Sequence, residues 1–270
     1  MILGINGATT EKCSLEDDIR IAGECGYEVV EIRHDKMEEY LKNHTCDDLV
    51  KLMLKAGVRP WTINAIGHST MQDAAGEARV AKETERFAEL AAAIGCPWIV
   101  ACPGKKENAS WDEILTRSSA SFAKQADIAW KKRVNISFEF LGFPWAAGQT
   151  VSEAWAIART ANRGNVGITI DTAHFYSGSS TLGEISALPR HAVAVFHMND
   201  LIDKPKHEIG DYDRVMPGEG VIPLREIVTE VKRIGFDGVA SIEIFNNDYN
   251  AQDPKTIAAK AIEKMGAFVK

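Results

Sequence analysis

The sequence contains no apolar run long enough to cross a membrane. No window approaches the roughly 18 uninterrupted apolar residues that a membrane-spanning helix needs. The opening residues, MILGINGATT, also lack the basic leader and long apolar core of a signal peptide. We therefore expect a cytoplasmic protein with no membrane partner.

Basic clusters are few and short, and acidic residues outnumber basic ones. The 270-residue chain has 31 Lys and Arg against 38 Asp and Glu, which gives a formal net charge of -7. The most basic stretch is the triplet at positions 131–133. An acidic surface repels the phosphate backbone of DNA and RNA, so we expect no nucleic-acid partner.

Cysteine is scarce, and its spacing lacks any paired motif. The five cysteines, at positions 13, 25, 46, 96 and 102, are odd in number and include no C-x-x-C pair. This pattern predicts reduced thiols rather than a disulfide framework or a thiolate metal site. Cysteine is therefore not expected to carry the chemistry.

Short apolar runs, several of them rich in Val and Ile, recur along the chain and predict strands. The runs are continuous rather than alternating, as is typical of parallel strands that are covered on both faces. Helical segments with capping signals separate them. We predict strands at 2–5, 29–32, 60–63, 98–101, 136–140, 167–170, 193–196 and 239–244. We predict helices within 14–26, 49–57, 83–95, 110–132, 151–160, 224–235 and 254–268.

About eight strand-helix units in a chain of this length favour the α/β class and a single (β/α)8 TIM barrel. A doubly wound open sheet is the alternative, but its usual nucleotide motifs, G-x-G-x-x-G after the first strand and G-x-x-x-x-G-K-[ST], are absent. No Pro-, Gly- or Ser-rich linker divides the chain, so we expect one domain over 1–270. The longest irregular segment, 199–221, is expected to be an active-site loop.

Metal-ligand residues end four consecutive late strands, where a barrel places its chemistry. The stretches NISFEF, GITID, AVAVFH and ASIEIF supply Glu139, Asp171, His197 and Glu243. Three carboxylates and an imidazole that converge on one point repel one another unless a cation lies between them. Oxygen and nitrogen ligands without a thiolate suit Mn, Mg, Co, Fe or Zn. The sequence therefore predicts a divalent-metal site.

Three further residues are predicted to contact substrate. His174 follows the sixth strand by three residues, in an expected loop, and His68 ends the third apolar run. Arg214, in the turn-rich segment DRVMPGEG, can fix a substrate oxygen through charge-assisted hydrogen bonds. The alternatives are rim histidines without a role and, for the arginine, a surface ion pair with Asp211 or Asp213.

These residues resemble the sugar phosphate isomerase/epimerase (xylose isomerase-like) superfamily, through FEF, DTAH, FHMND and SIEIF. More narrowly, nearly the whole chain is similar to the 2-keto-myo-inositol isomerases, or inosose isomerases. The segments that carry this likeness are GYEVVEIRHDKMEEYLKNHTCDDL, NRGNVGITIDTAHF and DYDRVMPGEGVIPL followed by IGFDGVASIEIF. Two segments depart from that pattern: NAIGHSTMQDAAGEARV around the third strand and the loop ACPGKKENAS. Both are expected to shape the substrate pocket.

The resemblance implies an isomerase of inositol and carbohydrate metabolism that acts on a polyol or keto-sugar. It would convert 2-keto-myo-inositol to its 1-keto isomer through an enediol, with His174 and Arg214 at the substrate. Glu139 and Glu243 would serve as acid and base. The implied ligands of the metal, which acts as a Lewis acid, are Glu139, Asp171, His197 and Glu243.

Other activities remain open on the same site. A ketose 3-epimerase returns the proton to the opposite face of one carbon, and an inosose dehydratase eliminates water instead. A zinc-dependent DNA-repair endonuclease shares the fold, but its cluster needs a histidine where this chain has Asp211, Tyr212 and Asp213. A non-catalytic sugar-binding barrel is a further alternative. Acidic barrels of this size often form homodimers, and the oligomeric state stays open.

Overall fold

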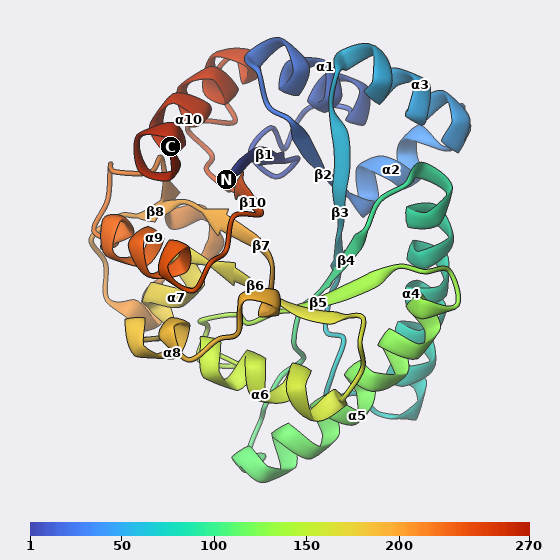
Figure 1. Cartoon of the computed structure of the whole chain (residues 1–270), viewed down its shortest axis with the longest axis vertical. Coiled ribbons are helices and arrows are strands. Elements are labelled where there is room, and N and C mark those ends of the chain that lie inside the picture. Colours follow the sequence, from blue (N-terminus) through green and yellow to red (C-terminus); the bar gives the residue numbers. More distant parts are fainter.

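Eight parallel strands form a closed barrel in the computed structural model, which describes residues 1–270 (Figure 1). The strand order around the barrel is β1-β10-β7-β6-β5-β4-β3-β2, so the first strand pairs with the last. This confirms the TIM barrel predicted from the apolar runs. The barrel strands are β1 (Ile2–Asn6), β2 (Val29–Arg33), β3 (Arg59–Ile66), β4 (Trp98–Ala101), β5 (Asn135–Glu139), β6 (Val166–Asp171), β7 (Val193–Met198) and β10 (Val239–Ile242).

Helices surround the barrel and bury its outer face (Figure 1). Their ends follow capping chemistry: the side chain of Ser14 caps the first helix, and Gly26 ends it in the left-handed conformation. The long helices are α1 (Leu15–Cys25), α3 (Cys46–Ala56), α4 (Ala74–Ile94), α5 (Trp111–Trp130), α6 (Val151–Ala161), α9 (Leu224–Arg233) and α10 (Pro254–Val269). The short helices are α2 (His34–Tyr40), α7 (Thr172–Ser177) and α8 (Leu182–Ser186).

The structure differs from the sequence-based prediction at several boundaries. Helix α4 begins nine residues before the expected 83–95 segment, because the side chain of Asp73 caps it by accepting from the backbone N–H of Gly76. Strand β3 continues past the 60–63 run, whereas β10 stops at Ile242. The three short helices were not predicted, since each is less than three turns long and lacks a clear apolar period.

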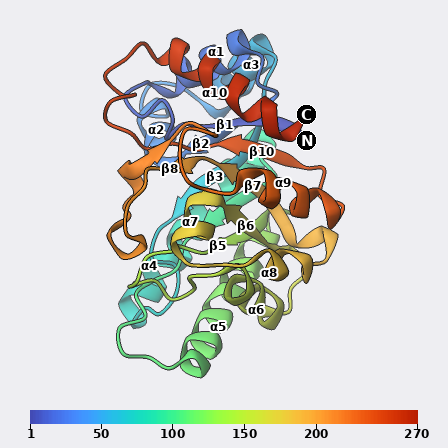
Figure 2. The same ribbon diagram turned by 90° about the vertical axis from the view of Figure 1, so that its left-hand side faces the viewer.

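The segment 199–221 is partly ordered into a hairpin rather than wholly irregular. Strands β8 (Asp200–Leu201) and β9 (Arg214–Val215) pair antiparallel. The buried carboxylate of Asp200 accepts hydrogen bonds from four backbone N–H groups, those of Leu201, Gly218, Gly220 and Ile222. This network holds the loop over the end of the barrel opposite to the chain termini (Figure 2).

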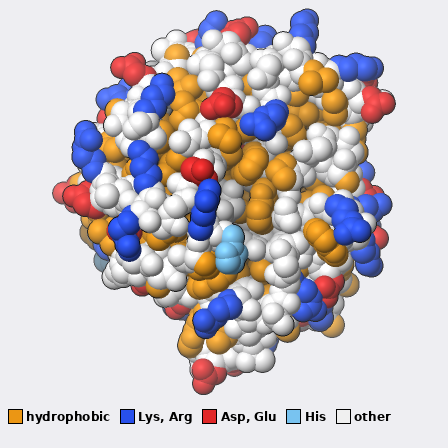
Figure 3. All heavy atoms as spheres, in the orientation of Figure 1, with side chains coloured by type: hydrophobic (Ala, Val, Ile, Leu, Met, Phe, Trp, Pro, Cys, Tyr) orange, Lys and Arg blue, Asp and Glu red, His pale blue; other side chains and the backbone are white.

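The structure also shows how the apolar, cysteine and charged residues are placed. A single cluster of 64 buried apolar residues joins the barrel to its helices. All five cysteines are free, as their spacing predicted. No helix combines the length and apolar content that crossing a bilayer requires. On the face shown in Figure 3, acidic and basic side chains are interspersed with apolar ones.

The close packing of α1 on the end of α3 predicts a sensitive glycine. A Cβ added at Gly23 would lie 2.2 Å from the backbone oxygen of Ala56, so one helix must shift. We expect Gly23→Ala to lower the free energy of unfolding by roughly 1 to 3 kcal/mol, measured by urea denaturation. The matched control is Gly266→Ala in α10, where the nearest atom is 3.5 Å away. Gly266→Ala should raise the free energy of unfolding by about 0.5 to 1 kcal/mol. Equal effects of the two substitutions would contradict the packing explanation.

Candidate metal centre

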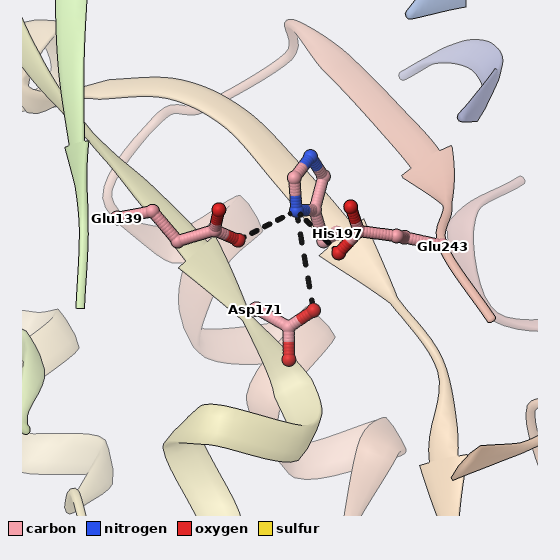
Figure 4. Close-up of side chains that lie close together, drawn as sticks. All are labelled: Glu139, Asp171, His197 and Glu243. Atoms are coloured by element: carbon pink, nitrogen blue, oxygen red, sulfur yellow. Dashed lines mark hydrogen bonds and ion pairs between the residues drawn. The ribbon is translucent and has the colours of Figure 1, made fainter. Parts of the chain in front are cut away.

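Four side chains from the carboxyl ends of adjacent strands meet at the barrel mouth. Their ligand atoms all lie within 4.8 Å of one another, and all four residues are buried: Glu139, Asp171, His197 and Glu243. Glu139 and Asp171 are the last residues of β5 and β6, His197 is the penultimate residue of β7, and Glu243 directly follows β10. Figure 4 shows the two glutamates approaching the imidazole from opposite sides.

The geometry of this group fits a divalent metal ion. Nδ1 of His197 lies 2.8 Å from Oε1 of Glu139, 3.2 Å from Oε2 of Glu243 and 3.9 Å from Oδ2 of Asp171 (Figure 4). Ligand atoms that each bind an ion at 2.0–2.2 Å stand roughly 3 to 3.5 Å apart. The donors are one imidazole nitrogen and three carboxylates, a set that suits Zn or Mn and excludes metals that need thiolates.

Glu31 orients the imidazole from the opposite side of the barrel. Its Oε2 lies 3.0 Å from Nε2 of His197 and also accepts a hydrogen bond from the hydroxyl of Thr62 at 2.7 Å. Because an ionised carboxylate can only accept, Nε2 of His197 must carry a proton, which leaves the Nδ1 lone pair for a cation. Glu31 is itself buried in β2.

Charge and burial together perturb the pKa values of this group. Burial raises the pKa of Glu139 to about 7, and the charge of Glu243 adds to the shift. Burial lowers the pKa of His197, but Glu31, Glu243 and Glu139 outweigh it and hold that pKa well above its usual range. An imidazolium at His197 therefore partly offsets the carboxylates, and a bound cation would displace its Nδ1 proton.

Arg214 is buried and belongs to the centre, and the ion pair with Asp211 considered from the sequence forms at this buried guanidinium rather than at the surface. Its Nη1 donates to Oδ2 of Asp171 at 3.0 Å and to Oε2 of Glu243 at 2.9 Å, and Nη2 reaches Asp211 at 3.2 Å. The guanidinium also lies 5.3 Å from the centre of the Phe245 ring. Burial opposes the charge of Arg214, but the carboxylates of Asp171 and Glu243 outweigh burial and raise the pKa of Arg214. Burial also opposes the charge of Glu243, but His197 and Arg214 hold the pKa of Glu243 well below its usual range.

His174 lies in α7 rather than in a loop, because the carboxylate of Asp171 caps that helix by accepting from the backbone N–H of His174. Its Nε2 lies 3.2 Å from Nη2 of Arg214. Since a guanidinium only donates, Nε2 accepts and the proton sits on Nδ1. That Nδ1 is buried and has no hydrogen-bond partner in the protein. Burial also lowers the pKa of His174 and favours the neutral ring.

His68 is not part of the convergent group. It is exposed on the loop after β3, and its ring lies 5.7 Å from that of Trp145. Asp211 reaches the centre only through Arg214. The convergent group therefore contains none of His68, His174 and Asp211.

Sequence reasoning missed three buried polar residues that support the centre. They are Glu31, Asn64, whose amide lies 3.5 Å from Oε1 of Glu243, and Asn199, whose amide donates to Asp171 at 2.8 Å. Glu31 lies inside the predicted run 29–32 and Asn64 directly follows the run 60–63, and these positions were the available signal. Asn199 follows directly on β7 in the segment FHMND.

Known proteins share this fold and much of this sequence. Residues 19–267 match the model of the family described as xylose isomerase-like TIM barrel. The chain belongs to that family. Among members of the xylose isomerase-like family, the inosose isomerase of Bacillus subtilis strain 168 is 33% identical to this chain over 252 residues. The aligned region covers 92% of this chain and 91% of the relative. It is 32% identical to the inosose isomerase of Bacillus velezensis over 92% of this chain and 90% of the relative.

A solved xylose isomerase-like structure is similar over the whole chain. The crystal structure of the IOLI protein with a bound zinc atom superposes with a TM-score of 0.96 at 31% sequence identity, covering 100% of this chain and 98% of that one. The resemblance inferred from the sequence is thereby confirmed. A divalent metal is consistent with both the zinc-bound relative and the buried donor set.

The contact between Glu31 and His197 leads to a prediction on metal affinity. Glu31→Gln preserves size but removes the charged acceptor of the Nε2 proton, so the imidazole loses both its orientation and part of its basicity. We expect the dissociation constant for Zn²⁺ to rise about 10- to 100-fold, measured by competition with a chromophoric chelator. Glu28→Gln, a nearby glutamate that bonds only to the backbone of Leu3, is the control. Unchanged zinc affinity in Glu31→Gln would contradict the assigned contact.

Proposed function

We propose that the protein is a divalent-metal-dependent inosose isomerase that interconverts 2-keto-myo-inositol and its 1-keto isomer. The observation that carries this proposal is the buried group of three carboxylates and one imidazole, with two glutamates on opposite sides. The names of the relatives support it, since both are inosose isomerases and the similarity extends over about nine-tenths of the length of each.

In this proposal four residues hold the metal: Glu139, Asp171, His197 and Glu243. When bound, the ion supplies Lewis-acid polarisation of a carbonyl and its neighbouring hydroxyl. Asn199 and Arg214 hold Oδ2 of Asp171 in place from outside the group. The protein thus presents a preformed set of donors rather than one assembled on binding.

The two glutamates are the proposed proton carriers. Each directs one oxygen toward His197, while its other oxygen makes only a long contact: Oε2 of Glu139 with Cys102 at 3.6 Å, and Oε1 of Glu243 with Asn64 at 3.5 Å. One glutamate removes the proton from the carbinol carbon while the carbonyl oxygen gains a proton, which gives an enediol. The original hydroxyl then loses its proton and the former carbonyl carbon gains one, which completes the exchange without net oxidation. Each transfer contributes roughly 10²- to 10⁴-fold in rate.

His174 and Arg214 are the proposed substrate contacts. The unpartnered Nδ1–H of His174 is a buried donor, and such groups are rarely left unpaired in native proteins. A substrate oxygen would satisfy it. Arg214 keeps the His174 ring in this orientation and also leaves its own Nε–H without a partner. His68 is proposed to lie at the rim, outside the reacting centre.

Deuterium exchange tests the reaction. We would incubate the metal-loaded protein with inososes and ketohexoses in D2O and follow the substrate carbons by NMR. Deuterium incorporation with a displaced carbonyl is expected for 2-keto-myo-inositol. Incorporation with inversion at one carbon would instead identify an epimerase, loss of water a dehydratase, and no incorporation in any substrate a non-catalytic barrel.

A further inference from the structure

A cavity of about 820 Å³ lies at the same end of the barrel as the metal centre and is not used by the proposed reaction. Two loops form most of its wall, 67–73 after β3 and 102–110 after β4. These loops lie within the two segments that are expected to depart from the inosose isomerase pattern. That expected departure therefore falls on a cavity rather than on the reacting centre.

A row of rings connects this cavity with the metal centre. His68 lines the cavity, and successive ring centroids from His68 to Trp145, Phe143 and His174 are 5.7, 5.7 and 5.1 Å apart. Trp145 remains 38% exposed. On the other side, Cys102 at the start of the second loop touches Glu139. Trp145, the exposed ring between His68 and His174 in this row, offers an apolar surface that suits the C–H face of a sugar ring.

The loops that form the wall are held in fixed positions. Arg79 donates to the backbone oxygens of Gly67 and His68, and the backbone N–H of Lys106 donates to Trp145. Gly104 lies so close to the first loop that an added Cβ would be 2.0 Å from the oxygen of Thr70. A preformed wall of this kind favours binding, because little order has to be created when a ligand enters.

The lining is polar, with donors and acceptors in balance. Only two of its 11 residues are hydrophobic. Its charged side chains comprise three cations and three carboxylates: Lys105, Lys106, Arg117, Asp73, Glu107 and Glu113. Lys105, Glu107 and Asn108 make no hydrogen bond or ion pair, whereas Arg117 is paired with Glu113 at 3.1 Å. Hydroxyl groups both donate and accept, so an uncharged polyol suits this lining, whereas three cations and three carboxylates give a phosphate no net attraction.

We propose that this cavity is a subsite for a second sugar ring, and that the preferred substrate is a keto-polyol bearing a glycosyl substituent. This inference rests on the proposed function for the reacting end of the substrate. The cavity is open to solvent, and its volume leaves room for a further six-carbon ring. The glycosyl ring would lie beyond Trp145, between the loops after β3 and β4.

The test compares a free keto-inositol, its O-glucoside and its phosphate ester in the deuterium-exchange assay with the metal-loaded protein. We expect kcat/KM for the glucoside to exceed that for the free compound at least tenfold. The double variant Lys105→Ala/Asn108→Ala should lower kcat/KM for the glucoside and leave that for the free compound unchanged, so that the preference falls to less than threefold. Lys51→Ala, an exposed change on α3, is the matched control and should leave the preference intact.

Calorimetric binding of glucosyl myo-inositol, which has no carbonyl to react, separates this inference from the proposed reaction. We expect it to bind the wild-type protein at least tenfold more tightly than the double variant. If no compound exchanges deuterium but this difference in binding is found, the reaction is wrong and the subsite stands. Equal kcat/KM for the free compound and the glucoside, a preference for the phosphate ester, or equal binding to both proteins would overturn the subsite.

Discussion

Glu243→Gln is expected to lower the rate of deuterium exchange by roughly 10²- to 10⁴-fold, the usual contribution of a positioned acid or base. Glutamine keeps the size of the side chain but cannot accept the proton. Because the side chain is buried and its Oε1 has only the long contact with Asn64, no neighbouring group can take its place. The measurement is kcat at saturating metal, with metal content determined by elemental analysis of the same sample.

Glu24→Gln provides the control for this loss. Glu24 is an exposed residue of α1 that pairs with Arg20 and Lys255, so its substitution should change kcat less than twofold. Full turnover by Glu243→Gln with metal still bound would exclude the proposed proton carrier. Loss of turnover that excess metal fully restores would assign the residue to metal binding alone.

Arg214→Met is expected to destabilise the metal-free protein by roughly 3 to 5 kcal/mol, since it leaves two buried carboxylates without their partner. For a chain of this size, the midpoint temperature of thermal unfolding should decrease by roughly 10 °C. A bound metal ion offsets the same carboxylates, so the loss should be clearly smaller in the loaded protein. Calorimetry with excess Zn²⁺ and with EDTA measures both states.

Arg190→Met is the control for Arg214→Met. Arg190 forms an exposed pair with Asp237, and such pairs contribute about 0 to 1 kcal/mol. Its substitution should therefore have a small effect that is the same with and without metal. An equal loss of stability in loaded and metal-free Arg214→Met would show that the guanidinium does not share the role of the cation.

The barrel and the convergence of its strand ends could be predicted because both follow from local pattern. Continuous apolar runs indicate covered parallel strands, and a polar residue that ends such a run must face the mouth. Four residues named in this way do lie together, although their role as metal ligands remains a prediction.

Contacts across the barrel could not be predicted in the same way. Glu31 meets His197 only because barrel closure places β2 three strands from β7, and strand pattern does not reveal how far two inward side chains reach. The burial of Arg214 depends on the hairpin of β8 and β9, which brings a residue of an expected loop under the rim. Its short strands carry too few residues to show a period.

The pairing of β1 with β10 has a consequence for how the protein acquires its metal. Glu31 and His197 are 166 residues apart in the chain, and the side of the barrel that joins β2 to β7 is complete only when the last strand has paired with the first. Contacts between such distant residues form slowly during folding. A nascent chain therefore presents most of the donors long before they converge, and high-affinity capture of the ion should coincide with the final step of barrel closure.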